Sequence, residues 1–354
     1  MSSVSALWKT ITGSILTSPR QPPSVVTIPN AHIEPQAELV EPFDDGNDYF
    51  QVRINQMFLR AGRKWLTQID PMVFVVSEFL YNKTKQTIPF VVGPALLEQF
   101  GQPLPQGMII SNRTVAGLHP YRGGDFTLSV VLSQIPVNDL ARKFLGFLEQ
   151  VGGVLSFATA LGAYVKVGSV ILDGVDALFG LNGTLPLIAH QTTFHPSDPF
   201  APGYFALIDA PDLKRETFWV RENELHHGEN ASAAVPYRDT DFVLYSVVRA
   251  PDRKRTDVEQ LPFFEMYERV KTEAAGTKPE NWENAKVSMS ALYQTMVTSP
   301  DLTDWQADQL NDEYVARMVR IHERALGNVK HGAAVAVPDP MAGVRRKALD
   351  ILKL

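Results

Sequence analysis

The order of hydrophobic and polar positions divides the chain into helical and extended segments. Residues 1–17 have apolar side chains at helical spacing, namely Val4, Leu7, Trp8, Ile11 and Ile15. This spacing predicts a short amphipathic helix, and the proline-rich residues 18–42 predict an extended linker. Such a helix docks either on its own chain or on a partner, so Leu7, Trp8 and Ile11 are candidate interaction residues.

The next part of the chain is dominated by strand patterns. Residues 43–136 contain alternating and β-branched runs such as YFQVRINQMFL and PMVFVVSEFLY, which predict a first β-rich unit. Residues 137–182 change to the helical period and predict a central apolar helical segment. Strand patterns return in residues 183–256 and predict a second β-rich unit.

The remainder of the chain is predicted to be helical. Residues 257–327 indicate a helical bundle, in which Thr303 followed by Asp304 and Gln306 marks the start of the last helix. Residues 328–340 indicate a linker and residues 341–354 a basic amphipathic tail helix. Its apolar and basic side chains are further candidate interaction residues, namely Val344, Arg345, Arg346, Ile351 and Leu352.

Two similar phrases occur far apart in the sequence. PYRGGDFTLSVV begins at Pro120 and PYRDTDFVLYSV at Pro236, with seven of twelve positions identical. Each phrase predicts a turn entering a strand, in which alternate side chains share one face. The positions expected to be buried are Phe126, Leu128, Phe242 and Leu244. Across the two turns we expect ion pairs of Arg122 with Asp125 and of Arg238 with Asp241.

The repeated phrase suggests that the two β-rich segments are related. The fold class expected is therefore α+β. Two related β-rich units, sandwich-like or barrel-like, would surround a central apolar helix and be followed by a C-terminal helical bundle.

Composition narrows the function classes. The chain has 354 residues, enough for two or three packed units, and a net charge of −6, which disfavours nucleic acid as a partner. The sequence has no cysteine, which excludes disulfides, thiolate zinc sites and cysteine nucleophiles. The first residues lack the pattern of a signal peptide, so a cytoplasmic location is expected.

Motifs that carry chemistry are missing from the sequence. GxSxG, Walker A, HExxH and GxGxxG do not occur, so neither a catalytic residue nor a cofactor is predicted. His190, His195, His226 and His227 are candidate metal ligands, and the two histidine segments would share a zinc ion only as adjacent strands. Their spacing matches no metal motif, which favours solvated histidines.

Residues 151–180 form the most apolar segment of the chain. A core helix packed between two β layers is one interpretation, with Gly162, Gly168 and Gly174 permitting close helix approach. A membrane-inserting element is the other. The uncharged run from Gln150 to Val165 is shorter than the roughly 20 residues that span a bilayer.

These observations favour a non-enzymatic assembly or adaptor subunit that acts through protein–protein docking. The partner would be another protein or a second copy of the chain. No residue specifies the biological system, and a bacterial multi-protein, defence-type system is the working hypothesis. The alternatives are a membrane-acting effector that uses residues 151–180 and a metal-dependent hydrolase that uses the histidines. No known family's motif can be quoted from this sequence.

Overall fold

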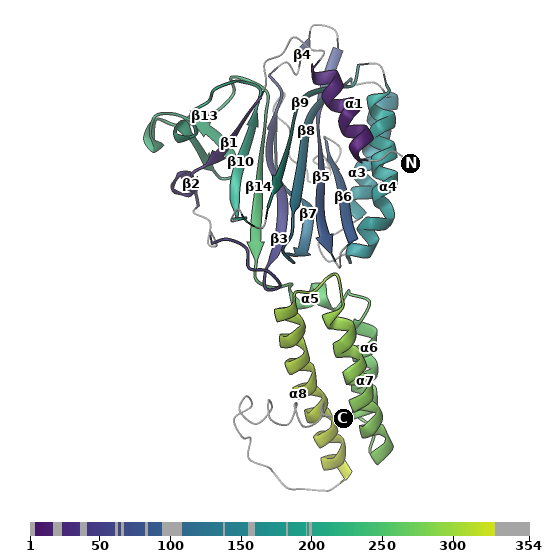
Figure 1. The fold of residues 1–354 in the computed structure, drawn as a ribbon. Helices are drawn as coiled ribbons and strands as arrows, with labels where there is room; N and C mark the ends of the chain where they lie inside the picture. Colours follow the sequence, from purple (N-terminus) through teal and green to yellow (C-terminus); the bar gives the residue numbers. More distant parts are fainter. Residues whose placement is uncertain are drawn as a thin grey trace. The chain divides into compact units, whose positions relative to one another are not determined.

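A computed structural model describes most of the chain (Figure 1). The described residues are 4–16, 23–35, 41–60, 63–64, 67–81, 84–93, 108–136, 139–154, 160–181, 183–195, 197 and 200–329. Contacts divide the chain into two compact units, residues 1–250 and residues 251–354. The fold is α+β, with largely antiparallel sheets in the first unit and helices in the second, as the sequence predicts.

The strands of the first unit form three sheets. Sheet I has the strand order β1 (Ser24–Ile28), β10 (Gly203–Ile208), β14 (Phe242–Ala250), β3 (Tyr49–Phe58) and β7 (Met108–Pro120). Sheet II contains β5 (Thr67–Tyr81), β8 (Phe126–Pro136) and β9 (Leu185–Phe194) in that order, and both β4 (Arg63–Lys64) and β6 (Thr84–Val92) pair with β5. Sheet III has the order β13 (Val235–Pro236), β12 (Glu224–His227), β11 (Phe218–Arg221) and β2 (Ile33–Glu34).

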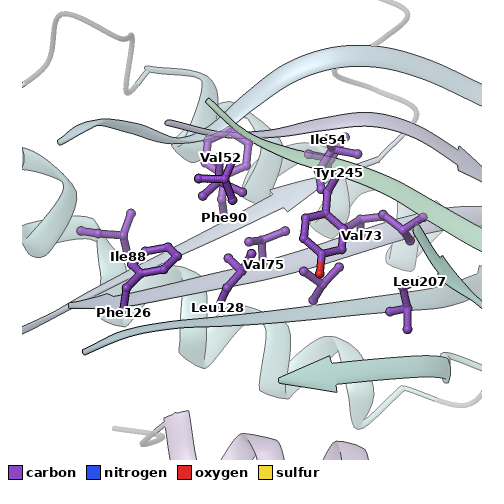
Figure 2. Close-up of a cluster of buried hydrophobic side chains, with 14 of the residues drawn as sticks. Val52, Ile54, Val73, Val75, Ile88, Phe90, Phe126, Leu128, Leu207 and Tyr245 are labelled. Atoms are coloured by element: carbon purple, nitrogen blue, oxygen red, sulfur yellow. The ribbon is translucent and has the colours of Figure 1, made fainter. Parts of the chain in front are cut away.

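Sheets I and II pack face to face and enclose the main hydrophobic core (Figure 2). Sheet I contributes Val52, Ile54 and Tyr245, and sheet II contributes side chains such as Val73 and Leu128. The side chains alternate along each strand, so the residues between these positions face away from this core. The two sheets therefore form a β-sandwich.

Helices cover the outer face of sheet II (Figure 1). They are α1 (Val4–Leu16), α3 (Asp139–Val154) and α4 (Leu161–Phe179). Phe74 and Val76 of β5 point to this side, opposite to Val73 and Val75, and pack with the helices. Because β5 is covered on both faces, its central residues, 72–76, form a continuous apolar run rather than an alternating one.

Sheet III covers the outer face of sheet I. Phe218 and Val220 of β11 pack with Phe242 and Leu244 of β14 in a separate hydrophobic cluster. The first unit therefore has four layers, in the order helices, sheet II, sheet I and sheet III (Figure 1).

The expected pair of β-rich units around a central helix is not confirmed. Strands from residues 43–136 and from residues 183–256 share both large sheets, since β14 pairs with β3 and β9 pairs with β8. The apolar segment 151–180 contains the end of α3 and the whole of α4, and α4 lies on the outer face of sheet II rather than between the β layers. Strands that are distant in the sequence therefore pair within the same sheets, and the two β-rich segments do not form separate units.

The two repeated phrases form similar corners. Each is a turn that enters a strand, and the burial predicted for Phe126, Leu128, Phe242 and Leu244 is confirmed. The first phrase leads from β7 in sheet I to β8 in sheet II, and the second leads from β13 in sheet III to β14 in sheet I. In both strands the Phe and Leu side chains face the sheet that the chain has just left.

The ion pairs expected within the two turns are replaced by longer-range ones. Asp125 pairs with His195 at 2.9 Å, and Arg238 pairs with Glu224. Asp241 instead accepts a hydrogen bond from the backbone amide of Arg60, at 2.8 Å. Asp125, Arg238 and Asp241 each have a partner outside their own turn, and these contacts tie the corners to neighbouring segments.

The three glycines of the apolar segment differ in their surroundings. A Cβ atom on Gly174 would lie 2.4 Å from Cδ2 of Leu148, so this glycine permits the close approach of α3 and α4. Gly168 faces Pro89 of β6 at 3.3 Å and therefore permits contact with a strand. At Gly162 a Cβ would meet nothing within 4 Å, so the role predicted for it in helix packing is wrong.

The described part of the second unit, residues 251–329, is helical. Its helices are α5 (Arg255–Val258), α6 (Phe264–Ala274), α7 (Pro279–Val297) and α8 (Asp304–Val329). Thr303 Oγ1 accepts a hydrogen bond from the Gln306 amide at 3.1 Å, which confirms the predicted start of α8. The Gln306 side chain in turn bonds both backbone groups of Arg253, at 3.0 and 2.9 Å.

Candidate functional site

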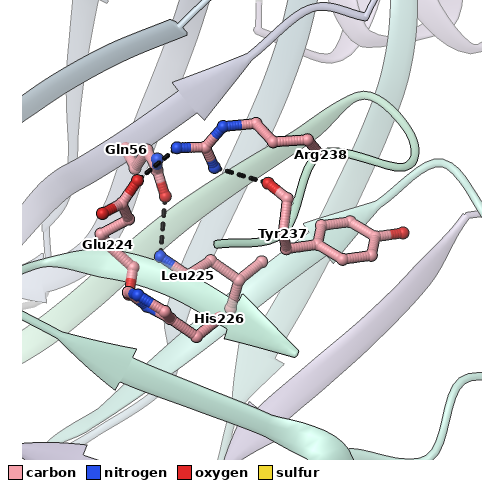
Figure 3. A network of polar contacts seen from close by, with 6 residues as sticks. All are labelled: Gln56, Glu224, Leu225, His226, Tyr237 and Arg238. Atoms are coloured by element: carbon pink, nitrogen blue, oxygen red, sulfur yellow. Dashed lines mark hydrogen bonds and ion pairs between the residues drawn. The ribbon is translucent and has the colours of Figure 1, made fainter. Parts of the chain in front are cut away.

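The seam between sheets I and III is held by buried polar contacts (Figure 3). Gln56 of β3 is fully buried, and its Oε1 accepts a hydrogen bond from the Leu225 amide at 2.8 Å. On the other side of the same residue, the Leu225 carbonyl accepts from the Tyr237 amide at 2.8 Å. The Gln56 side chain thus satisfies a backbone donor of β12 at the point where strand pairing ends.

Arg238 of the second phrase is engaged on three sides. One of its nitrogens, Nη2, donates to the Glu224 carboxylate, and Nη1 donates to the Tyr237 carbonyl at 2.5 Å (Figure 3). Its guanidinium lies 5.4 Å from the centre of the Phe58 ring, a cation–π distance. These contacts give Arg238 a role in joining the two sheets.

The hairpin between β11 and β12 has an unusual tip. Glu222 and Asn223 both have positive φ, 47° and 67°, as the two central residues of a tight hairpin turn require. Asn223 Oδ1 accepts hydrogen bonds from Asn55 Nδ2 at 3.0 Å and from the Tyr204 hydroxyl at 3.3 Å. The tip is therefore pinned onto sheet I.

The outer face of sheet III carries a cluster that we call the Trp219 face, made of His32, Glu34, Trp219, Arg221 and His226. His32 stacks on the Trp219 ring, with centroids 3.7 Å apart and an angle of 9° between planes. Trp219 Nε1 also donates to the Gly228 carbonyl at 3.1 Å, so the indole has a fixed orientation.

Charged and imidazole groups surround the stacked pair. Arg221 Nε donates to Glu34 at 3.0 Å, and the two residues are register partners on β11 and β2. His226 is the register partner of Trp219 on β12 and therefore lies on the same side of the sheet, where it is buried and its Nδ1 donates to the Glu224 carbonyl at 3.1 Å. The Trp219 face thus combines an aromatic stack with one ion pair on a rigid sheet.

The four candidate metal ligands do not come together. His190 and His195 belong to β9 of sheet II and its end, whereas His226 and His227 belong to β12 of sheet III. The adjacent strands that a shared site would need are absent, and the described part of the chain contains no group of three metal-ligating side chains. Burial lowers the pKa of His190.

The structure places the candidate interaction residues of the N-terminal helix but not those of the tail. Leu7 and Ile11 are buried in the cluster beneath the helices, and Trp8 packs against it half-buried, so α1 docks on its own chain in this structure. The candidates of the tail, Val344, Arg345, Arg346, Ile351 and Leu352, lie outside the described residues.

Sequence reasoning missed the Trp219 face. The run FWVR does alternate, with Phe218 and Val220 entering the core and Trp219 and Arg221 facing out. That alternation indicates a half-buried strand whose outer side carries Trp and Arg. His32, which completes the stack, precedes Trp219 by almost two hundred positions and has no local signal.

Comparisons of the chain with family models, curated proteins and solved structures give no match. None of the helices within the described ranges is long and apolar enough to cross a membrane.

Proposed function

We propose that this chain is a non-enzymatic assembly or adaptor subunit, and that the Trp219 face is a surface through which it docks on a partner protein or on a second copy of itself. The observation that carries the proposal is the His32–Trp219 stack beside the Arg221–Glu34 pair. Trp and Arg are the residue types that most often dominate the binding energy of protein interfaces.

The support beneath this face favours binding without large rearrangement. Gln56 and Asn223 fix sheet III to sheet I through buried or half-buried hydrogen bonds, and Arg238 contacts the Phe58 ring of sheet I. A rigid surface loses little conformational entropy when a partner binds. The proposal therefore assigns these polar residues to scaffolding and the outward-facing residues to recognition.

The test compares Trp219→Ala and Arg221→Ala with Glu216→Ala, which changes an exposed side chain just before β11. Self-association is measured by light scattering over a range of protein concentrations, and partner capture by quantitative pull-down from the native host. Both Trp219 and Arg221 variants should lose the association while their melting temperatures stay close to that of the wild type. Association that is unchanged in both variants would refute docking through this face.

A second candidate rests on the exposed apolar side chains of the helical layer. Phe147 of α3 and Val165 and Val170 of α4 are 48%, 46% and 45% exposed. A membrane-acting effector would use residues 151–180 after release of this layer from sheet II. Leakage of anionic liposomes that is abolished by Val165→Asp and Val170→Asp would favour this function over docking.

A further inference from the structure

A row of polar side chains crosses three neighbouring strands on the outer face of sheet I. Tyr204 of β10 is the register partner of Ser246 on β14, which is in turn the partner of Arg53 on β3. These strands lie side by side (Figure 1). Partners of this kind have Cβ atoms about 4.5–5.5 Å apart. We call these three residues the Arg53 row.

The face on which the row lies follows from alternation along β14. Phe242 and Leu244 face sheet III, whereas Tyr245 and Val247 face the main core. Ser246 therefore points to the same side as Leu244, and Tyr204 packs against that same cluster. The row lies beside the β11–β12 hairpin tip, on the face that also carries the apolar side chains Phe242 and Leu244 and the buried Gln56.

Ser246 is the unusual member of the row. It is completely buried, and its hydroxyl has no hydrogen-bond partner among the described residues. A buried polar group without a partner is unfavourable and requires an explanation, of which a bound ligand is one.

The neighbours of Ser246 supply charge and further hydrogen-bonding groups. Arg53 donates to the neutral side chain of Gln51 at 2.8 Å and has no carboxylate partner among the described residues. By contrast, Arg221 and Arg238 each pair with a glutamate. The Arg53 charge also acts on Tyr204, whose pKa is raised by burial and lowered in part by this guanidinium.

We infer that the Arg53 row is a binding site for a carboxylate group. A carboxylate is planar, carries one charge and only accepts hydrogen bonds, which suits the guanidinium fork of Arg53 and the hydroxyl of Ser246. The Tyr204 hydroxyl borders the site but already donates to Asn223 Oδ1. A phosphate monoester carries about twice that charge at neutral pH, and the row offers it a single cation. Arg53 and Tyr204 are half-buried and flank the fully buried Ser246 from the two neighbouring strands.

The Arg53 row shares no residue with the Trp219 face, although its Tyr204 contacts Asn223 at the hairpin tip. The carboxylate can belong to a free small acid or to the C-terminus of a partner protein, because both present the same group. The two sources differ in what surrounds the carboxylate. They are therefore separated by comparing small acids with peptides that end in a free or an amidated C-terminus.

The experiment titrates the full chain with acetate, succinate and a short peptide of each kind, at constant ionic strength, by calorimetry. We expect saturable binding to the wild type. The affinity should fall about tenfold or more in Arg53→Gln, because losing a hydrogen bond to a charged group weakens binding by about that factor. Ser246→Ala should weaken binding as well and leave the fold intact, because it removes an unsatisfied hydroxyl. Arg215→Gln changes an exposed arginine outside both the Arg53 row and the Trp219 face, and as the matched control it should bind like the wild type.

The titrations distinguish the two sources of the carboxylate. Binding of succinate without the free-ended peptide identifies a small acid, and tighter binding of the free-ended peptide than of the amidated one identifies a partner's C-terminus. The inference is wrong if no carboxylate binds saturably to the folded wild type, or if the affinity is the same in Arg53→Gln and Ser246→Ala as in the wild type.

Discussion

The Oε1 atom of Gln56 and the backbone amide of Leu225 lie 2.8 Å apart in the buried seam between sheets I and III. Replacing Gln56 by Leu removes the acceptor and leaves the amide buried without it. The free energy of unfolding should fall by about 1–3 kcal/mol, the usual cost of an unsatisfied buried group. Urea denaturation measures this change, and an unaltered midpoint would show that Leu225 finds another acceptor.

Gly174 and Gly162 belong to the same helix, and replacing each by alanine should change the stability in opposite directions. Gly174→Ala pushes a methyl group into Leu148 and should destabilise the first unit by about 1–3 kcal/mol. Gly162→Ala has open space and should stabilise it by up to about 1 kcal/mol through helix propensity. Chemical denaturation of both variants tests the pair. Combining Gly174→Ala with Leu148→Ala should cost less than the sum of the single changes, because the clash is removed.

Glu222 has a φ of 47°, which is costly for a residue with a large side chain. Asparagine tolerates this conformation, so Glu222→Asn should raise stability by about 0.5–1 kcal/mol. Valine is β-branched and should lower stability at the same position. The melting temperatures of the two variants should therefore move in opposite directions, and a shared direction would contradict the strain at this turn.

Tyr293 donates a hydrogen bond to Asp308 at 2.7 Å, and this bond, together with burial and the nearby aspartates, raises its pKa to about 12. An unfolded tyrosine has a pKa of about 10. Between these values the unfolded chain loses the proton first, so stability is full below about pH 10 and falls as the pH rises towards about 12.

Ultraviolet absorbance of tyrosinate, followed against pH, tests this value. Asp308→Asn should move the titration of Tyr293 down, and Tyr293→Phe should remove it and weaken the alkaline loss of stability. A titration of Tyr293 near 10 in the wild-type protein would contradict the hydrogen bond.

Local features of the fold were predictable from the sequence because they depend on neighbouring residues. The N-cap at Thr303 needs only a side chain and an amide three positions later. Burial of Phe126 and Phe242 follows from strand alternation after a turn. The layers were not predictable, since these two similar phenylalanines enter different clusters, and pairing such as that of β9 with β8 depends on distant segments.

In the candidate site, too, local features were predictable from the sequence, whereas contacts between distant residues were not. The alternation around Trp219 indicates an outward-facing aromatic residue, but its stacking partner His32 is distant in the sequence. The metal hypothesis assumed that neighbouring histidine segments in the sequence become neighbouring strands. Sheet I separates them instead, because β9 and β12 join sheets on opposite sides of it.

The position of β14 between β10 and β3 also determines when the first unit can fold during synthesis. A ribosome releases β3 and β7 early, whereas residues 242–250 emerge almost two hundred residues after β3. Until then one edge of β3 remains open in the nascent chain, and open edges of this kind attract other strands. The exposure of this edge is therefore longest in the interval before β14 inserts, and the sandwich is completed only when nearly all of the unit has left the ribosome.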